Sequence, residues 1–119
     1  MRTVDWILRI ESVAIFLAGV VLYLTMNGDP LWLLPLLLAP DLSMVGYLGG
    51  PRLGAVTYNL VHNLALALIA LAVGWFAGLA PLALIGAILV AHVGMDRSLG
   101  YGLKLPTDFK DTHLGRIGR

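Results

Sequence analysis

The sequence predicts an all-α membrane protein, a bundle of four transmembrane helices. Of its 119 residues, 59% are hydrophobic and 13% are charged, and the mean hydropathy is +0.87. Soluble chains carry about a quarter charged residues, so the lipid bilayer is the expected partner of most of the surface. A helix needs about 20 apolar residues to cross the hydrocarbon core, and the chain has room for four such spans.

Two clusters of turn-forming residues end the first two spans. Asn27-Gly28-Asp29-Pro30 follows the first apolar segment, and Gly49-Gly50-Pro51-Arg52 follows the second. Such clusters favour a turn over a continued helix. Asp5, Arg9 and Glu11 interrupt the N-terminal apolar stretch, so we expect a retained helix there rather than a cleaved signal peptide.

A third turn is required inside a long apolar stretch. Residues 64–91 contain no ionisable or amide side chain, and as one helix they would extend about 42 Å, beyond a hydrocarbon core of about 30 Å. Gly78-Leu79-Ala80-Pro81 is the expected turn. The spans are thus predicted at about residues 4–26, 31–48, 53–77 and 81–103, followed by a polar tail at 104–119.

Two prolines are expected to disturb the second span. Pro35 and Pro40 each remove a backbone donor and free a carbonyl one turn earlier. Irregular backbone at membrane depth is tolerated where it lines a cavity, so a kink or break here favours a pocket. The alternative is a merely bent helix in which Asp41 caps the following turn.

The basic residues predict the orientation. All eight lie at the N-terminus, in the connection between the second and third spans, or at the C-terminal end. The positive-inside rule therefore predicts that both termini lie in the cytoplasm. A net charge of +1 provides no concentrated basic face for nucleic acid, and the absence of cysteine excludes thiolate metal sites.

Costly polar side chains from all four spans are expected at one depth, in the cytoplasmic half. Glu11, Asp41, His62 and His92 come from successive spans. Ionisable groups within a span usually face the bundle interior, which predicts a polar pocket open to the cytoplasm. Sequence spacing adds further residues to the predicted pocket. Asn59, His62 and Asn63 lie on one face of a helix, and His92 and Asp96 form an i, i+4 pair. Ser43 follows Asp41 by two residues.

Three interpretations of this pocket remain open. In the first, His62, His92 and Asp96 bind zinc, iron or manganese, and Glu11 or Asp41 serves as a fourth ligand or as the general base of a metal-assisted hydrolase acting on a lipid or small amphiphile. In the second, the same groups bind or carry a small molecule or lipid without catalysis. In the third, the network is structural, with Glu11 paired to Arg97 or Arg9 and Asp96 accepting from Asn59 or His62.

The tail and the small residues leave two further alternatives. Asp111 and His113 either fold over the pocket as further binding residues or stay solvated, and Asp108 is expected to be solvated. Small residues recur every four positions in the third and fourth spans, and they serve either the bundle itself or a homodimer. These residues are Ala70, Gly74 and Gly78, followed by Ala83, Ala87 and Ala91.

A short similarity suggests an internal duplication. Asp41–Leu48 and Asp96–Leu103 both read Asp-x-Ser followed by Gly-Tyr. If the similarity reflects duplication, the bundle consists of two parallel two-helix repeats related by an axis along the membrane normal. Asp41 and Asp96 would then be equivalent.

Several strings resemble the bacterial DUF4260 family of small integral membrane proteins: RIES at Arg9–Ser12, APDLSMVGYLGGPRLG at Ala39–Gly54, YNLVHN at Tyr58–Asn63, AHVGMDRSLGYGLK at Ala91–Lys104 and FKDTHLGRIG at Phe109–Gly118. The resemblance covers nearly the whole chain. It implies a compact four-span protein whose signature strings contain the pocket residues, and it implies no particular reaction.

Overall fold

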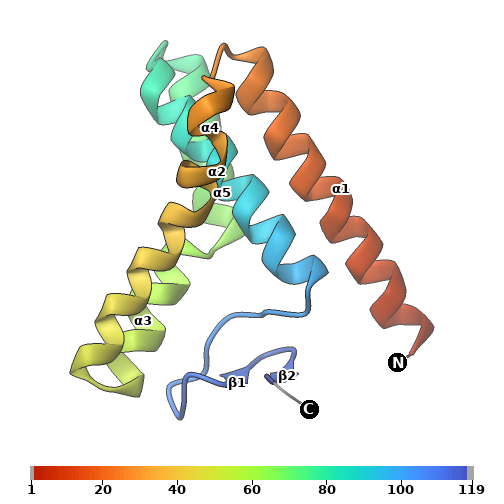
Figure 1. Ribbon diagram of the computed structural model, residues 1–119, viewed down its shortest axis with the longest axis vertical. Helices are drawn as coiled ribbons and strands as arrows, with labels where there is room; N and C mark the ends of the chain where they lie inside the picture. Colours follow the sequence, from red (N-terminus) through yellow and green to blue (C-terminus); the bar gives the residue numbers. More distant parts are fainter. Residues whose placement is uncertain (1, 118–119) are drawn as a thin grey trace.

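The computed structural model describes residues 2–117, and these contain four apolar helical segments long enough to cross a membrane (Figure 1). The predicted all-α, four-span architecture is therefore confirmed. The first segment is the uninterrupted helix α1 and the fourth is α5. The two middle segments each consist of two helices. In chain order, the helices are α1 Thr3–Thr25, α2 Pro30–Leu38, the 3₁₀ helix η1 Ala39–Gly49, α3 Pro51–Val61, α4 Leu64–Phe76 and α5 Ala80–Ser98, so the second segment is α2 with η1 and the third is α3 with α4.

The turn after α1 shows how its sequence ends the helix. Asn27 adopts a left-handed φ of 65°, and the N–H of Gly28 bonds to the carbonyl of Tyr23 at 2.8 Å. Asp29 then caps α2 by accepting from the N–H of Leu31 at 2.9 Å. Asparagine tolerates the left-handed conformation that ends many helices, so this turn forms where the cluster of turn-forming residues predicts it.

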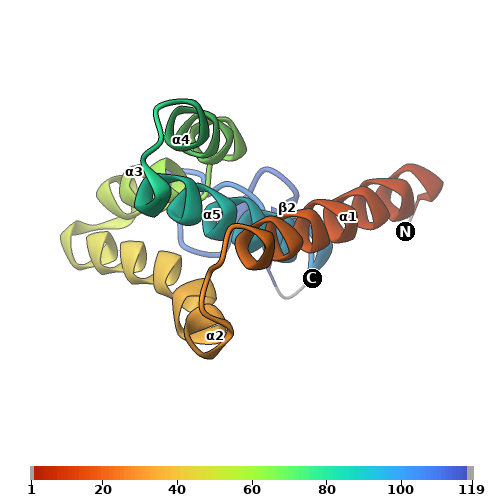
Figure 2. The same cartoon turned by 90° about the horizontal axis from the view of Figure 1, so that it is seen from above.

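Helix α5 is the centre of the fold, with α1 and α4 packed against it (Figures 1 and 2). Over half of its membrane-length window is buried, at 56%, compared with 17% for each other segment. Glycine permits this close packing: a Cβ on Gly19 would lie 2.5 Å from the nitrogen of Ala91, and one on Gly74 would lie 2.2 Å from the nitrogen of Ala83. Several of the regularly spaced small residues therefore serve packing within the chain.

The middle spans are both broken, but only one of the breaks was predicted. The second span changes from α-helix to 3₁₀ helix just before Pro40, as the prolines indicate. The third span, predicted at about residues 53–77, corresponds to one apolar segment at Pro51–Phe76, but this segment contains a break that was not predicted, because α3 ends at Val61 and α4 begins at Leu64. The amide oxygen of Asn63 caps α4 by accepting from the N–H groups of Ala65 and Leu66.

The C-terminal part of the chain is more folded than a polar tail. Helix α5 ends at Ser98, before the expected limit of residue 103, because Gly100 has a φ of 90° and the N–H of Tyr101 turns back to the carbonyl of Asp96 at 2.8 Å. Strands β1 (Asp111–Thr112) and β2 (Gly115–Arg116) then form an antiparallel hairpin. Arg119 lies outside the described residues.

One end of the molecule collects most of the charge. Figure 1 shows the N-terminus, the turn between η1 and α3, and the hairpin at one end, and the other two interhelical turns at the opposite end. We call the first the basic end, because every described Lys and Arg lies in the segments that reach it.

Candidate metal centre

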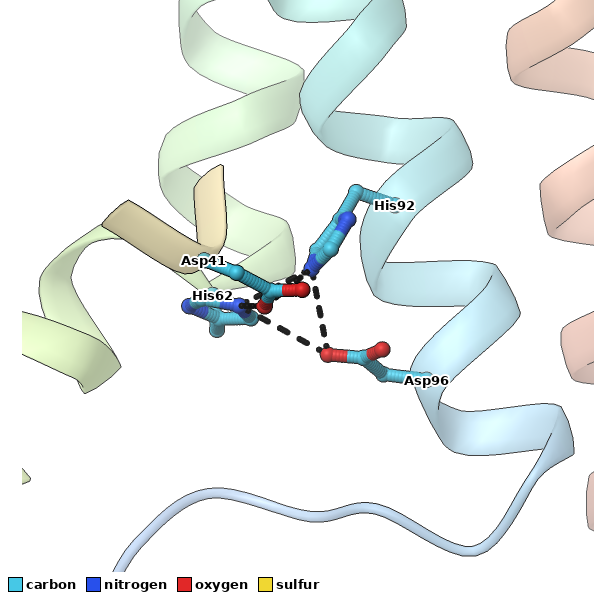
Figure 3. Close-up of side chains that lie close together, drawn as sticks. All are labelled: Asp41, His62, His92 and Asp96. Carbon is cyan, nitrogen blue, oxygen red and sulfur yellow. Dashed lines mark hydrogen bonds and ion pairs between the residues drawn. The ribbon is translucent and has the colours of Figure 1, made fainter. Parts of the chain in front are cut away.

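Asp41, His62, His92 and Asp96 meet between α5 and the two broken spans (Figure 3). One nitrogen or oxygen from each of the four side chains lies within 4.8 Å of all the others. The Nε2 atoms of the two histidines are 2.9 Å apart. Oδ1 of Asp41 lies 3.2 Å from Nε2 of His62 and 3.1 Å from Nε2 of His92, and Oδ2 of Asp96 lies 3.6 and 3.3 Å from them. We call these residues the His–Asp cluster.

The two helix breaks position half of the cluster. Asp41 follows Pro40 in the first turn of η1, and His62 occupies the gap between α3 and α4. His92 and Asp96 are one turn apart on α5, so they share a face of that helix. The sequence therefore brings a straight helix and two interrupted ones to one point.

Both imidazoles are held through their Nδ1 atoms. Nδ1 of His62 lies 2.9 Å from the carbonyl oxygen of Tyr58, and Nδ1 of His92 lies 2.6 Å from that of Leu37. A carbonyl can only accept a hydrogen bond, so each Nδ1 carries the hydrogen. In the neutral ring, Nε2 then has a lone pair and no hydrogen, and both of these lone pairs lie in the cluster.

The change from α-helix to 3₁₀ helix explains why the Leu37 carbonyl is available. Leu37 lies in the last turn of α2, and its α-helical partner, the N–H of residue 41, lies in η1, where bonds join residues three apart instead of four. Position 40, three residues after Leu37, is a proline and has no N–H to donate. The His92 ring therefore donates to a carbonyl that the break in the second span leaves free.

Three of the four side chains in the cluster are buried, and the fourth is partly exposed. The side chains of His62 and His92 are fully buried, at 0% exposure, and that of Asp96 is 8% exposed. The side chain of Asp41 is 37% exposed. Any exchange with the surroundings is therefore expected to occur at Asp41.

Tyr58 belongs to the site although sequence reasoning overlooked it. Its ring stacks on that of His62, with centroids 3.6 Å apart and planes 7° from parallel, and its hydroxyl donates to Oδ2 of Asp96 at 3.2 Å. The overlooked signal was its spacing: Tyr58 precedes His62 by four residues, which places the two side chains on one helical face.

Lys104 was also overlooked. Its side chain is buried, and Nζ lies 3.9 Å from the ring centroid of Phe109 and 4.9 Å from that of Tyr58. Burial lowers the pKa of Lys104, while the negative charges of Asp96 and Asp41 act in the opposite direction. The lysine thus adds a positive charge beside the cluster.

Four predicted pocket residues lie outside the His–Asp cluster, and three of them form hydrogen bonds with the backbone instead. Glu11 is exposed on α1, and the α1 ribbon lies on the side of α5 that faces away from the cluster (Figure 3). Ser43 donates to the carbonyl of Pro40 at 2.8 Å, and Asn59 bonds to the backbone N–H and carbonyl of Lys104 at 2.7 and 2.8 Å. Asn63 caps α4, because the break after Val61 ends the helical stripe that would have aligned it with His62.

Asp111 and His113 organise the C-terminal hairpin rather than join the cluster. The carboxylate of Asp111 accepts from the hydroxyl of Thr107 at 2.7 Å and pairs with Arg116. Nδ1 of His113 accepts from the N–H of Leu103 at 2.8 Å. Asp108, expected to be solvated, is half exposed and also pairs with Arg116, at 3.1 Å.

Of the contacts in the structural interpretation, the one between His62 and Asp96 is present at 3.6 Å, whereas the ion pairs of Glu11 are not found in residues 2–117. There Glu11 makes no ion pair with Arg9 or Arg97. Arg97 instead donates to two carbonyl oxygens, those of Tyr101 at 2.8 Å and of His62 at 3.1 Å. Arg97 therefore stabilises the backbone at the break that carries His62.

The two Asp-x-Ser strings behave alike in part. Asp41 and Asp96 both enter the His–Asp cluster, and the hydroxyls of Ser43 and Ser98 each donate to the carbonyl three residues earlier. Their backbones differ, because the first string lies in a 3₁₀ helix and the second begins in the last turn of an α-helix. The similarity therefore extends to side-chain placement but not to backbone conformation.

Comparison with known proteins places the chain in a family. No curated protein and no solved structure matches it. The family model described as "Domain of unknown function (DUF4260)" matches residues 5–117, which include the whole His–Asp cluster. Because this match covers nearly the entire chain, the protein belongs to the DUF4260 family.

Proposed function

We propose that this protein is a membrane metalloprotein whose His–Asp cluster binds one divalent transition metal ion. The observation that carries the proposal is the pair of Nε2 atoms facing each other at 2.9 Å beside two carboxylate oxygens. With neutral imidazoles and ionised carboxylates, all four atoms are hydrogen-bond acceptors and repel one another. A cation at their centre converts this repulsion into attraction, at a depth where unpaired charge is costly.

The four atoms are close enough together to surround a zinc ion, which makes zinc the first candidate. Zinc binds imidazole nitrogen and carboxylate oxygen at about 2.0–2.2 Å, so the ligand atoms of a tetrahedral site lie about 3.3–3.6 Å apart. Two of the pairs in the cluster are separated by distances in this range, 3.3 and 3.6 Å, and three pairs are closer, at 2.9, 3.1 and 3.2 Å, so they would move apart slightly around the ion. Mixed nitrogen and oxygen ligands without thiolate also suit iron and manganese, which compete for the same site.

The hydrogen bonds around the cluster are of the kind that orient metal ligands in proteins. Metal-binding histidines usually donate their second N–H to a carbonyl or carboxylate, which fixes the tautomer and the ring orientation. His62 and His92 both do so, through Tyr58 and Leu37. The Tyr58 hydroxyl restrains Asp96 in the same way. Three of the four proposed ligands are thus held in place by their neighbours.

Metal analysis of the purified full-length protein tests the proposal. We expect about one zinc, iron or manganese ion per chain in the wild type and almost none in His92→Ala, because structural metal sites need their full ligand set. His113→Ala is the matched control, since it removes an imidazole outside the cluster and should keep the metal. A metal-free wild-type protein, or equal metal in His92→Ala, would reject the proposal.

A metal-assisted hydrolase acting on a lipid or small amphiphile is a second candidate, favoured by the 37% exposure of the Asp41 side chain. A metal in such a site supplies Lewis-acid activation of water or of a substrate carbonyl or phosphoryl oxygen. Asp41 is the one proposed ligand accessible enough to give way to a substrate. Lys104 adds a positive charge nearby that would stabilise a developing negative charge.

We further propose that the chain lies in the bacterial inner membrane with its basic end in the cytoplasm. The support is the placement of the basic residues, which follows the positive-inside rule. The chain has no cysteine, so single cysteines are clean probes. Thr25→Cys and Ala77→Cys, both exposed near turns at the other end, should react with an impermeant thiol reagent applied to intact cells. Arg52→Cys should react only after lysis, and the reverse pattern contradicts this orientation.

A further inference from the structure

A second polar cavity lies at the basic end, apart from the His–Asp cluster. Its volume is about 640 Å³, which is within the usual range for small-molecule sites. It lies between the N-terminal half of α1, the C-terminal end of α5 and the hairpin. Its lining residues are Arg2, Asp5, Leu8, Arg9, Glu11, Ser12, Ile15, Arg97, Gly100, His113 and Leu114.

The packing of α1 on α5 explains this cavity. The two helices touch at Gly94, where a Cβ would lie 2.4 Å from the nitrogen of Phe16. Towards the basic end, long arginine side chains replace glycine: Arg9 from α1 and Arg97 from α5 both line the cavity. Gly94 therefore marks a close contact between the helices, and the cavity towards the basic end is lined by charged as well as apolar groups.

The charges that line the cavity are unequally neutralised. Arg2 pairs with Asp5 at 3.3 Å. Among the described residues, neither Arg9 nor Glu11 forms an ion pair or hydrogen bond through its side chain, and Arg97 bonds only to carbonyl oxygens. Partial burial and the positive charge of Arg97 lower the pKa of His113. Two guanidinium groups and one carboxylate therefore remain without a charged partner.

We propose that this cavity binds the headgroup of a phospholipid that carries a primary amine, with the phosphate at Arg9 and Arg97 and the ammonium group at Glu11. Guanidinium groups bind phosphate through charge-assisted hydrogen bonds. A primary ammonium group donates hydrogen bonds to a carboxylate, whereas a quaternary ammonium group has no N–H to donate. A headgroup without an amine leaves Glu11 close to the phosphate with no compensating cation. The membrane-spanning helices on two sides of the cavity make a lipid the natural source of such a headgroup.

Lipid competition with the full-length protein tests the proposal. The detergent-solubilised protein is mixed with equal amounts of phosphatidylethanolamine, phosphatidylglycerol and phosphatidylcholine, and bound lipid is measured by native mass spectrometry. We expect selective retention of phosphatidylethanolamine, about a tenfold loss of it in Arg9→Gln, and equal retention of phosphatidylethanolamine and phosphatidylglycerol in Glu11→Gln. Arg52→Gln is the control, because Arg52 is an exposed arginine outside the cavity.

Two results would overturn the proposal. One is equal retention of the three lipids by the wild type, and the other is unchanged selectivity in both cavity variants. Soluble glycerophosphoethanolamine, added as a competitor, distinguishes the source: complete displacement of the lipid at equal concentration would replace the lipid assignment by a soluble ligand. Metal content is measured on the same samples and should not change in Arg9→Gln, so failure at this cavity and failure at the His–Asp cluster are distinguishable.

Discussion

A strong chelator is expected to lower the thermal unfolding midpoint of the wild-type protein by roughly 15 °C. A ligand present at a thousand times its dissociation constant stabilises the folded state by about 4 kcal/mol. For a chain of this size, 1 kcal/mol corresponds to about 4 °C. The effect should be large here because metal loss also leaves the Nε2 atoms of His62 and His92 facing each other at 2.9 Å.

The measurement is tryptophan fluorescence during heating, in detergent, with and without chelator. Readdition of zinc should restore the original midpoint, whereas magnesium, which prefers oxygen ligands, should not. His92→Ala should unfold near the midpoint of the chelated wild type and should not respond to chelator. Identical wild-type midpoints with and without chelator would contradict a bound metal in the cluster.

The replacement Asp41→Asn is expected to act in opposite directions on metal binding and on the stability of the metal-free protein. The variant loses a negatively charged ligand, so metal affinity should fall by at least about 100-fold. Even the loss of a residue that only hydrogen-bonds to a metal ligand can lower metal affinity by as much as about 100-fold. The metal-free protein should gain about 1 kcal/mol in free energy of unfolding. The gain arises because an asparagine amide can donate to the Nε2 atoms, which lie 3.2 and 3.1 Å from Oδ1 of Asp41.

Lower metal affinity together with higher stability of the metal-free protein distinguishes a metal centre from a purely structural network. If the histidines were held as imidazolium ions by their aspartates, removal of the Asp41 charge would destabilise the folded protein. Metal affinity is measured by competition with a fluorescent chelator, and stability by heating in excess chelator. Asp108→Asn is the matched control, since it removes a half-exposed surface carboxylate that pairs with Arg116. A metal-free Asp41→Asn protein less stable than the metal-free wild type would favour the structural network.

Much of the fold is predictable because membrane insertion depends on local composition. The number of spans follows from apolar stretches of sufficient length, and their ends follow from clusters such as Asn27–Pro30 and Gly78–Pro81. The break near Pro40 is equally local, because proline lacks the N–H that a helix requires. By contrast, no proline or glycine in the sequence predicts the gap between α3 and α4 at His62. The backbone at this gap is stabilised by the Asn63 cap on α4 and by the hydrogen bond from Arg97 to the His62 carbonyl.

The site was predictable as a set of residue types but not as a set of contacts. Histidine and aspartate inside apolar spans are costly, so their presence indicates interior positions. His92 and Asp96 could be paired from their spacing, and both enter the cluster. Glu11 appeared equivalent by depth, yet it faces a different cavity, because depth along a helix does not specify the face from which a side chain projects.

The amino-acid sequence alone therefore predicted the number of membrane-length apolar segments and identified the polar residues within them that require an explanation, since each of these depends on short windows of the chain. The meeting of Asp41 and His62 with His92 and Asp96 could be seen only in the folded molecule. Each residue advances a helix by about 100°, and a break resets that rotation. The direction of a side chain beyond a break thus depends on the contacts of distant residues, here Leu37 with His92 and Arg97 with His62.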